Sequence, residues 1–121
     1  MKMTPEQSND FNALTRKQKE FFARSEMEHP NWNFNQVMSR VVFQSQMDTM
    51  IDNGGQNVNS NDPSFWIAVL EGAKSALIRF KSIGKSIISS IDATLVSLKT
   101  MIILGIKNAG KTIKDLFGKI F

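Results

Sequence analysis

Residues 62–121 of this chain read DPSFWIAVLEGAKSALIRFKSIGKSIISSIDATLVSLKTMIILGIKNAGKTIKDLFGKIF. Asp62 and Pro63 open the stretch as a helix start, with an N-cap acid followed by a proline at the first helical position. No further proline follows, and apolar residues recur every three or four positions from Trp66 to Ile120. At 100° per residue these side chains fall within roughly 140° of a helical face, and most lysines fall outside it. The pattern predicts one long amphipathic helix.

Two shorter helices are predicted before that stretch. Thr4, followed by a proline and an acid, is a start signal for a helix that ends near Glu26, ahead of a histidine–proline turn. Asn33 and Gln36 have the spacing of a capping box for a second helix, which ends near Ile51. The Asn- and Gly-rich residues that follow predict a loop, because both residue types tolerate positive φ.

The fold class is therefore predicted as all-α: two short helices packed on the first half of a long C-terminal helix. Residues 1–61 form the two-helix region and residues 62–121 the long helix, within a single domain. Glycine costs roughly 1 kcal/mol relative to alanine inside a helix. Gly105 and Gly110 are the best candidates for a bend.

Charge is distributed unevenly along the chain. The 121 residues carry a formal net charge of +4 and contain no cysteine, which excludes disulfides and thiolate metal sites. Up to Pro63 there are 6 Lys or Arg against 8 Asp or Glu, and after it 9 against 3. A clearly basic second half suggests an acidic partner or a membrane surface.

No segment has the pattern of a signal peptide or a standard transmembrane helix. The N-terminus lacks an apolar core. The most apolar stretch, 83–106, is interrupted by Lys85, Asp92 and Lys99, each costing roughly 2.5–3.5 kcal/mol at a membrane helix centre. We therefore expect synthesis in the cytoplasm, with incorporation into a particle or association with a membrane as further steps.

Length gives the main functional argument. A straight helix of about 58 residues is about 87 Å long, whereas the two shorter helices span only about 30 Å each. They cannot cover the second half of the apolar stripe, and large exposed apolar patches usually mark interaction sites. No strong turn signal favours a hairpin, so a second subunit or a membrane is the expected contact. The predicted interface comprises Leu95, Leu98, Ile102, Ile106, Ile113, Leu116, Phe117 and Ile120.

A second, thinner apolar line lies beside the main stripe. It consists of Ile67, Ile78, Val96 and Ile103. Contact on two sides of a helix favours an assembly over a membrane surface.

One segment matches a nucleotide-binding pattern. Gly105-Ile-Lys-Asn-Ala-Gly110-Lys111-Thr112 fits the phosphate-binding loop GxxxxGK[ST], and with its flanks it resembles the first strand and loop of Arf-like small GTPases. The resemblance implies phosphate binding by the glycine backbone and Lys111, and magnesium binding by Thr112. The match spans about 15 residues, only nine follow Thr112, and the pattern is in phase with the apolar stripe. We therefore interpret the segment as helix and predict no cofactor.

The remaining chemistry-bearing residues predict no catalytic or metal site. His29 precedes Pro30 in a turn, and no second ligand stands at useful spacing. Glu26 and Glu28 are close together, but no catalytic partner is near them. The chain is accordingly predicted not to be an enzyme.

The sequence favours a structural or assembly subunit that forms a homo-oligomer or larger assembly through its C-terminal helix. A virion, secretion-machine or filament component suits this description. The first alternative is a membrane-active protein that contacts anionic lipid through the same helix. The second is nucleic-acid packaging through a basic face. That face consists of Lys99, Lys107, Lys111 and Lys114.

Overall fold

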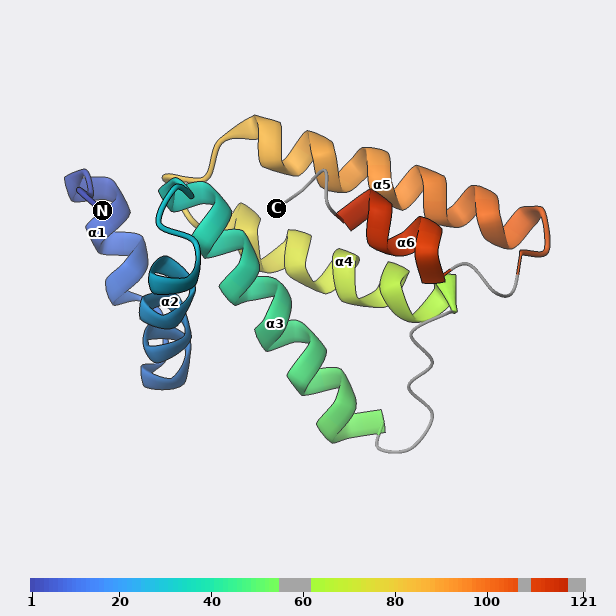
Figure 1. Ribbon diagram of the computed structural model, residues 1–121, viewed down its shortest axis with the longest axis horizontal. Helices are drawn as coiled ribbons and strands as arrows, with labels where there is room; N and C mark the ends of the chain where they lie inside the picture. The colour runs from blue at the N-terminus through green and yellow to red at the C-terminus, as the bar shows by residue number, and fades with distance from the viewer. Residues whose placement is uncertain (55–61, 107–109, 118–121) are drawn as a thin grey trace.

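A computed structural model describes residues 1–54, 62–106 and 110–117 (Figure 1). Within these ranges the chain is helical and contains no strand, which confirms the all-α prediction. The helices are α1 (Pro5–Asn12), α2 (Arg16–Glu28), α3 (Phe34–Gly54), α4 (Pro63–Ile78), α5 (Lys85–Ile103) and α6 (Gly110–Phe117).

Residues 5–28 form two helices, α1 and α2, where the sequence predicted a single helix from Thr4 to about Glu26. Thr4 begins α1 as expected, and its side chain accepts a hydrogen bond from the Gln7 amide at 3.1 Å. The helix ends at Asn12, and Thr15 begins α2 with a second reciprocal capping box to Gln18. The prediction of a single helix to Glu26 was therefore wrong. At this point the Thr15 hydroxyl, and not a backbone carbonyl, accepts the hydrogen bond of the Gln18 amide, as at the start of a new helix.

Helix α3 connects the two halves of the molecule. The predicted capping box at its start is present, since Asn33 and Gln36 exchange hydrogen bonds of 2.9 Å. The helix continues to Gly54, so residues 52–54 of the predicted loop are helical and residues 55–61 lie outside the described part. One side of α3 buries Val37 and Met38 against α1 and α2, and the other side packs on α4.

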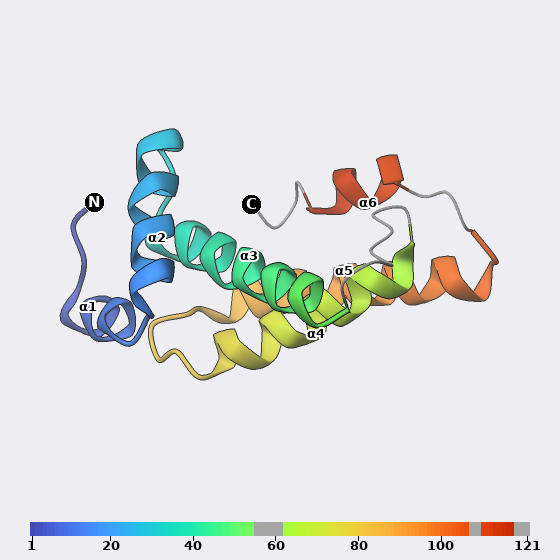
Figure 2. The same ribbon diagram turned by 90° about the horizontal axis from the view of Figure 1, so that it is seen from below.

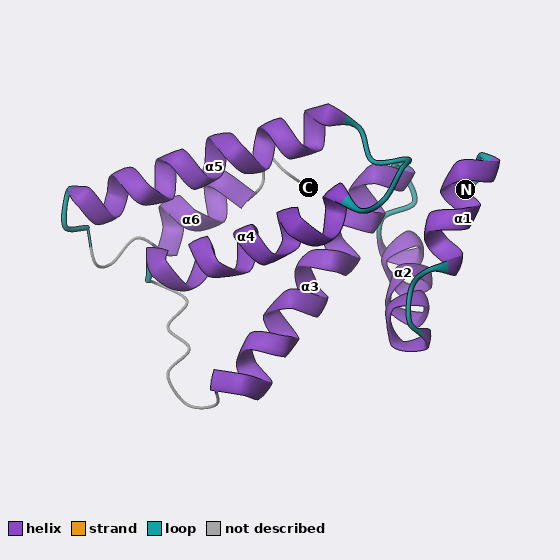
Figure 3. Cartoon of the chain, turned by 180° about the vertical axis from the view of Figure 1, so that it is seen from behind, coloured by secondary structure: helices purple, strands orange, loops and turns teal. Residues whose placement is uncertain are grey.

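The predicted long helix is instead a hairpin of α4 and α5. Asp62 caps α4 as expected, with its side chain accepting from the Ser64 amide at 2.9 Å, but the helix ends at Ile78. The chain then turns, and α5 runs back antiparallel along α4 (Figures 1 and 3). The apolar stripe of each helix faces the other, so the two halves of the stripe bury one another.

A buried carboxylate from α1 holds the turn of the hairpin. Asp10 accepts hydrogen bonds from the backbone amides of Lys81 at 3.3 Å and Ser82 at 2.8 Å, and from the Ser82 hydroxyl. In a continuous helix those two amides would bond to carbonyls four residues earlier. Asp10 therefore replaces the helical ladder where α4 ends.

A second turn separates α5 from α6. The amide of Ile106 donates to the Met101 carbonyl, and that of Gly105 donates to the Ile102 carbonyl, both at 3.0 Å. Gly105 has φ +72°. This is the Schellman arrangement that ends many helices, and it requires a left-handed residue for which glycine is suited. The chain thus turns where the glycines predicted a bend, although residues 107–109 lie outside the described part.

The helices form two layers, one of which is the α4–α5 hairpin itself. Figure 2 shows α3 and α6 on one side of the α4–α5 pair, and no described helix on the other side. Helices α1 and α2 gather at one end of the long axis, and α5 finishes at the opposite end. The hairpin core is built from residues of α3 to α6: Val42, Phe43, Trp66, Val69, Leu70, Ala73, Leu77, Ile91, Leu95, Leu98, Met101 and Ile113.

Candidate interaction surfaces

Several residues of the predicted interface are already covered by their own chain. Leu98 is fully buried, and Leu95 and Ile113 are also buried, all within the hairpin core. Leu116 is half-buried and packs against the same core. The expectation that the second half of the stripe has no intrachain partner was wrong for these residues, because α5 packs against α4 and α6 packs on the same core. Leu98 and Ile113 are thus enclosed by the folded chain, whereas Leu116 stays partly exposed and Leu95 lines a shallow groove between α4 and α5.

Other residues of the predicted interface are exposed together at the end of α5. Ile102 and Ile106 are 45% and 42% exposed, and between them Ile103 and Leu104 are 83% and 69% exposed. We call these four residues the apolar tip. The Schellman turn at Gly105 reverses the chain here and leaves the four aliphatic side chains in solvent. The side chain of Phe117 and residue Ile120 lie outside the described part.

The lysines of the predicted basic face do not share one helix. Lys99 lies on α5, and its ammonium is 3.5 Å from the Glu71 carboxylate on α4. Lys111 and Lys114 are exposed on α6, which runs back beside α5 from the apolar tip (Figure 1). Lys107 lies outside the described residues. The three described lysines of the predicted basic face therefore occupy two surfaces. Lys99 pairs with an acid of another helix, and among the described residues Lys111 and Lys114 have no such pair.

The side of the hairpin away from α6 forms a second surface. Its large apolar side chains are Ile78 and Val96, which are 61% and 65% exposed. Small exposed residues surround them, and a shallow groove of about 680 Å³ runs between the helices. We call this surface the open face. It consists of Ala68, Glu71, Lys74, Ser75, Ile78, Asp92, Ala93, Val96 and Lys99.

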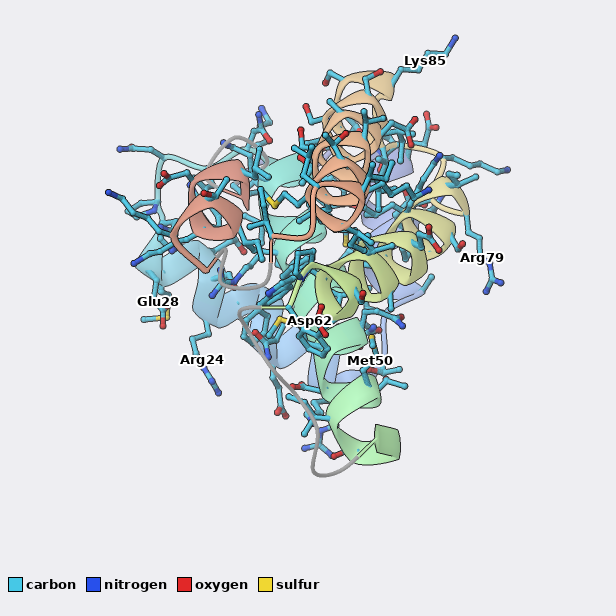
Figure 4. All side chains as sticks on the ribbon, turned by 90° about the vertical axis from the view of Figure 1, so that its right-hand side faces the viewer. Arg24, Glu28, Met50, Asp62, Arg79 and Lys85 are labelled. Carbon is cyan, nitrogen blue, oxygen red and sulfur yellow. The ribbon has the colours of Figure 1, made fainter. Side chains whose placement is uncertain are left out.

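Ion pairs cross the open face between the two helices. The Lys74 ammonium lies 2.5 Å from the Asp92 carboxylate, and the Glu71–Lys99 pair spans the same groove. The four side chains balance in charge. Figure 4 looks along the hairpin from the apolar tip and shows Arg79 projecting on this side, with α6 on the other. Ile78 and Val96 both belong to the thin apolar line found in the sequence. Only the hairpin brings them to one face of the molecule, beside ion pairs that join the two helices.

The segment that resembles a GTPase phosphate loop has a different local structure. A phosphate-binding loop follows a strand, whereas Met101 to Ile103 form the last turn of α5. Gly105, the first glycine of the pattern, serves as the left-handed residue after that helix. Lys111 and Thr112 lie exposed in the first turn of α6, and residues 107–109 are not described. The structure therefore assigns the first glycine of the pattern to helix termination.

The other polar features of the described residues are local. A groove of about 370 Å³ between α2 and α3 is lined by mixed charges, including Lys17, Arg24 and Asp48. His29 is the exposed C-cap of α2, and its ring stacks on Trp32 with centroids 3.7 Å apart. Among the residues in the described ranges, no three His, Asp or Glu side chains lie together as metal ligands would.

Helix α5 has the length and composition of a membrane-spanning helix, with a mean hydropathy of 1.4, in spite of the charges noted in its sequence. Helices in the cores of water-soluble proteins, which are mostly buried, also meet this criterion, whereas 28% of the window is buried in α5. Comparisons with protein-family models, with curated proteins and with solved structures found no match. The two surfaces therefore have to be interpreted from their own chemistry.

Proposed function

We propose that this chain is a non-enzymatic assembly subunit that associates with further copies of itself through the open face. The observation that carries the proposal is the exposure of Ile78 and Val96 on a helix pair that no described helix covers on that side. Removing such a side chain from water stabilises a contact by ~1.5–3 kcal/mol when burial is complete. A second helix pair laid on this face would bury both.

The small side chains on the open face suit the packing of a further helix. Ala68, Ser75 and Ala93 are exposed beside the two large apolar residues. Small side chains at a contact allow helix axes to approach to about 8 Å, the lower end of the usual range. A partner helix can therefore reach the groove that lies between α4 and α5.

The charges of the open face favour a second copy over a polyanion. Glu71 and Asp92 stand opposite Lys99 and Lys74, so two acids and two bases line the groove of this face. In a two-fold contact the same patch meets itself, and each acid can lie against a base of the other copy. A lipid headgroup or a nucleic acid would instead meet two carboxylates. Self-association is thus the contact that this charge pattern fits best.

The proposal is tested by measuring mass with light scattering across a concentration series, without lipid. We expect a mass above the 13.6 kDa of one chain that rises with concentration. In the double variant Ile78→Glu/Val96→Glu the dissociation constant should rise at least tenfold, because four added carboxylates would meet in each dimer. Both positions are exposed, so the monomer is expected to fold normally.

A matched control adds two carboxylates elsewhere. Ala23 and Met27 are exposed one turn apart on α2, at the far end of the molecule from most of the open face. Ala23→Glu/Met27→Glu should leave the concentration dependence unchanged. A wild-type chain that stays monomeric at high concentration contradicts the proposal, as does equal association by the two double variants.

Nucleic-acid packaging remains a separate candidate, supported by exposed Lys111 and Lys114 on α6. It predicts retention of DNA or RNA that falls steeply with salt. Retention that survives in Lys111→Gln/Lys114→Gln would remove α6 as its basis.

A further inference from the structure

We propose that the apolar tip is a separate binding surface that enters the outer layer of an anionic membrane, with the hairpin intact. This inference does not rest on self-association, since it uses different residues. Four large aliphatic side chains are exposed within five positions, and residues 101–106 contain no polar side chain. Exposed apolar side chains concentrated at one end of a molecule, with no intervening polar group, are suited to the acyl boundary of a bilayer.

Several backbone carbonyls at the tip already have hydrogen-bond partners within the chain, which suits a region of low water content. The carbonyls of Thr100, Met101 and Ile102 accept hydrogen bonds from the amides of Leu104, Ile106 and Gly105, each at 3.0 Å. A helix end usually leaves its last carbonyls dependent on water, and each unsatisfied group is costly near hydrocarbon. The Schellman turn satisfies two of them internally, those of Met101 and Ile102, so insertion of the tip leaves fewer backbone groups without a partner.

Charge beside the tip has a single dominant sign. Residues 93–121 contain five lysines and one acid, Asp115. Of these lysines, Lys111 and Lys114 are exposed on α6, which begins near the tip and runs back along α5. Lysines near an anionic leaflet each contribute roughly fivefold in affinity. The arrangement of aliphatic residues ahead of lysines matches the order of acyl chains and headgroups in a lipid surface.

The same features disfavour a second copy at the tip. Two tips in contact would bring the lysines of one α6 toward those of the other, which is repulsive. The tip also lies at the end of the long axis, where four side chains present less area than the ~800 Å² per partner of a standard interface. Lipid needs no complementary shape and is the occupant that the charge and the small area favour.

The experiment uses the full chain, which contains no native cysteine. Leu104→Cys is labelled with an environment-sensitive dye and mixed with vesicles of phosphatidylcholine, with or without a third of phosphatidylglycerol. We expect a blue shift and an intensity rise with the anionic vesicles and little change with neutral ones. The same dye at Ala23→Cys on α2 should report no change. Equal response to neutral vesicles, or none to anionic ones, overturns the proposal.

Depth and charge are tested by further variants. A dye at Ser89→Cys, exposed near the start of α5, should stay in water; a lipid signal there would indicate spanning by α5 and contradict shallow insertion. Leu104→Ser/Ile106→Ser should weaken vesicle co-sedimentation at least tenfold, and Lys111→Gln/Lys114→Gln about 25-fold. Unchanged affinity in either pair would refute the assignment. The open-face variant Ile78→Glu/Val96→Glu should still sediment with lipid, so the two proposals can fail separately.

Discussion

The turn between α4 and α5 depends on one side chain, so removal of that side chain should be costly. Asp10 is buried and accepts three hydrogen bonds from Lys81 and Ser82, more than 70 positions later in the chain. The change we consider is Asp10→Ala. It removes the acceptors from two backbone amides and one hydroxyl, and leaves a space where the carboxylate was.

The expected magnitude follows from the individual bonds. A hydrogen bond to a charged group contributes ~1.5–3 kcal/mol net. The two bonds from Ser82 are counted in full, whereas the 3.3 Å bond from Lys81 adds little because Lys81 is exposed to water. Water entering beside half-buried Ser82 offsets part of the loss. We expect Asp10→Ala to lower the free energy of unfolding by about 3 kcal/mol, a large share of the ~5–15 kcal/mol typical of a domain.

The assay is urea unfolding followed by far-ultraviolet circular dichroism. Asp10→Asn keeps one acceptor oxygen without the charge, so it should lose about half as much stability. Asn9→Ala, exposed on the same helix, should change stability by less than about 0.5 kcal/mol. A double variant with Ser82→Ala should lose less than the sum of the single changes, because both remove the same bonds. An Asp10→Ala protein no less stable than Asn9→Ala would refute this account of the turn.

Three further substitutions separate the roles of buried leucine and of two glycines. Leu98→Ala should destabilise the chain by ~2–5 kcal/mol. That loss should be independent of protein concentration in urea unfolding, because Leu98 is buried within its own hairpin. A loss that changes with concentration would show that Leu98 lies at an interface between chains. Gly105→Ala should cost about 1 kcal/mol in the same assay, owing to its φ of +72°, and an unchanged midpoint would contradict the Schellman turn. Gly72→Ala should be neutral or stabilising by up to about 1 kcal/mol, since the new methyl displaces only the mobile end of Gln46; a loss above 1 kcal/mol would show that Gln46 cannot move.

Helix starts were predictable because their signals are local. Thr4, Asn33 and Asp62 each bond to an amide two or three residues ahead, so both partners can be found in a short stretch of sequence. The start of α2 carried the same signal at Thr15 and Gln18 and was missed, although the capping-box spacing is present in the sequence. Local chemistry of this kind is recoverable without knowledge of tertiary contacts.

The end of α4 was not predictable in the same way. Residues 79–84 contain no proline, and no described residue among them has a positive φ. The amides of Lys81 and Ser82 leave the helical ladder for Asp10, whose sequence position gives no indication of that partnership. A tertiary bond of this type overrides a helical pattern, which is why apolar spacing alone predicted a continuous helix.

An apolar stripe shows that a face is buried but does not identify what buries it. Leu70 of α4 and Leu98 of α5 are both buried in the hairpin core, so this part of the pattern that suggested an external partner is explained within the chain. Apolar residues outside the main stripe that stay exposed are more informative about partners, because packing within the chain does not cover them. Ile78 and Val96 are such residues, and they are exposed on the open face. For an amphipathic hairpin, the contact surface should therefore be sought among apolar side chains that the intrachain stripe leaves over.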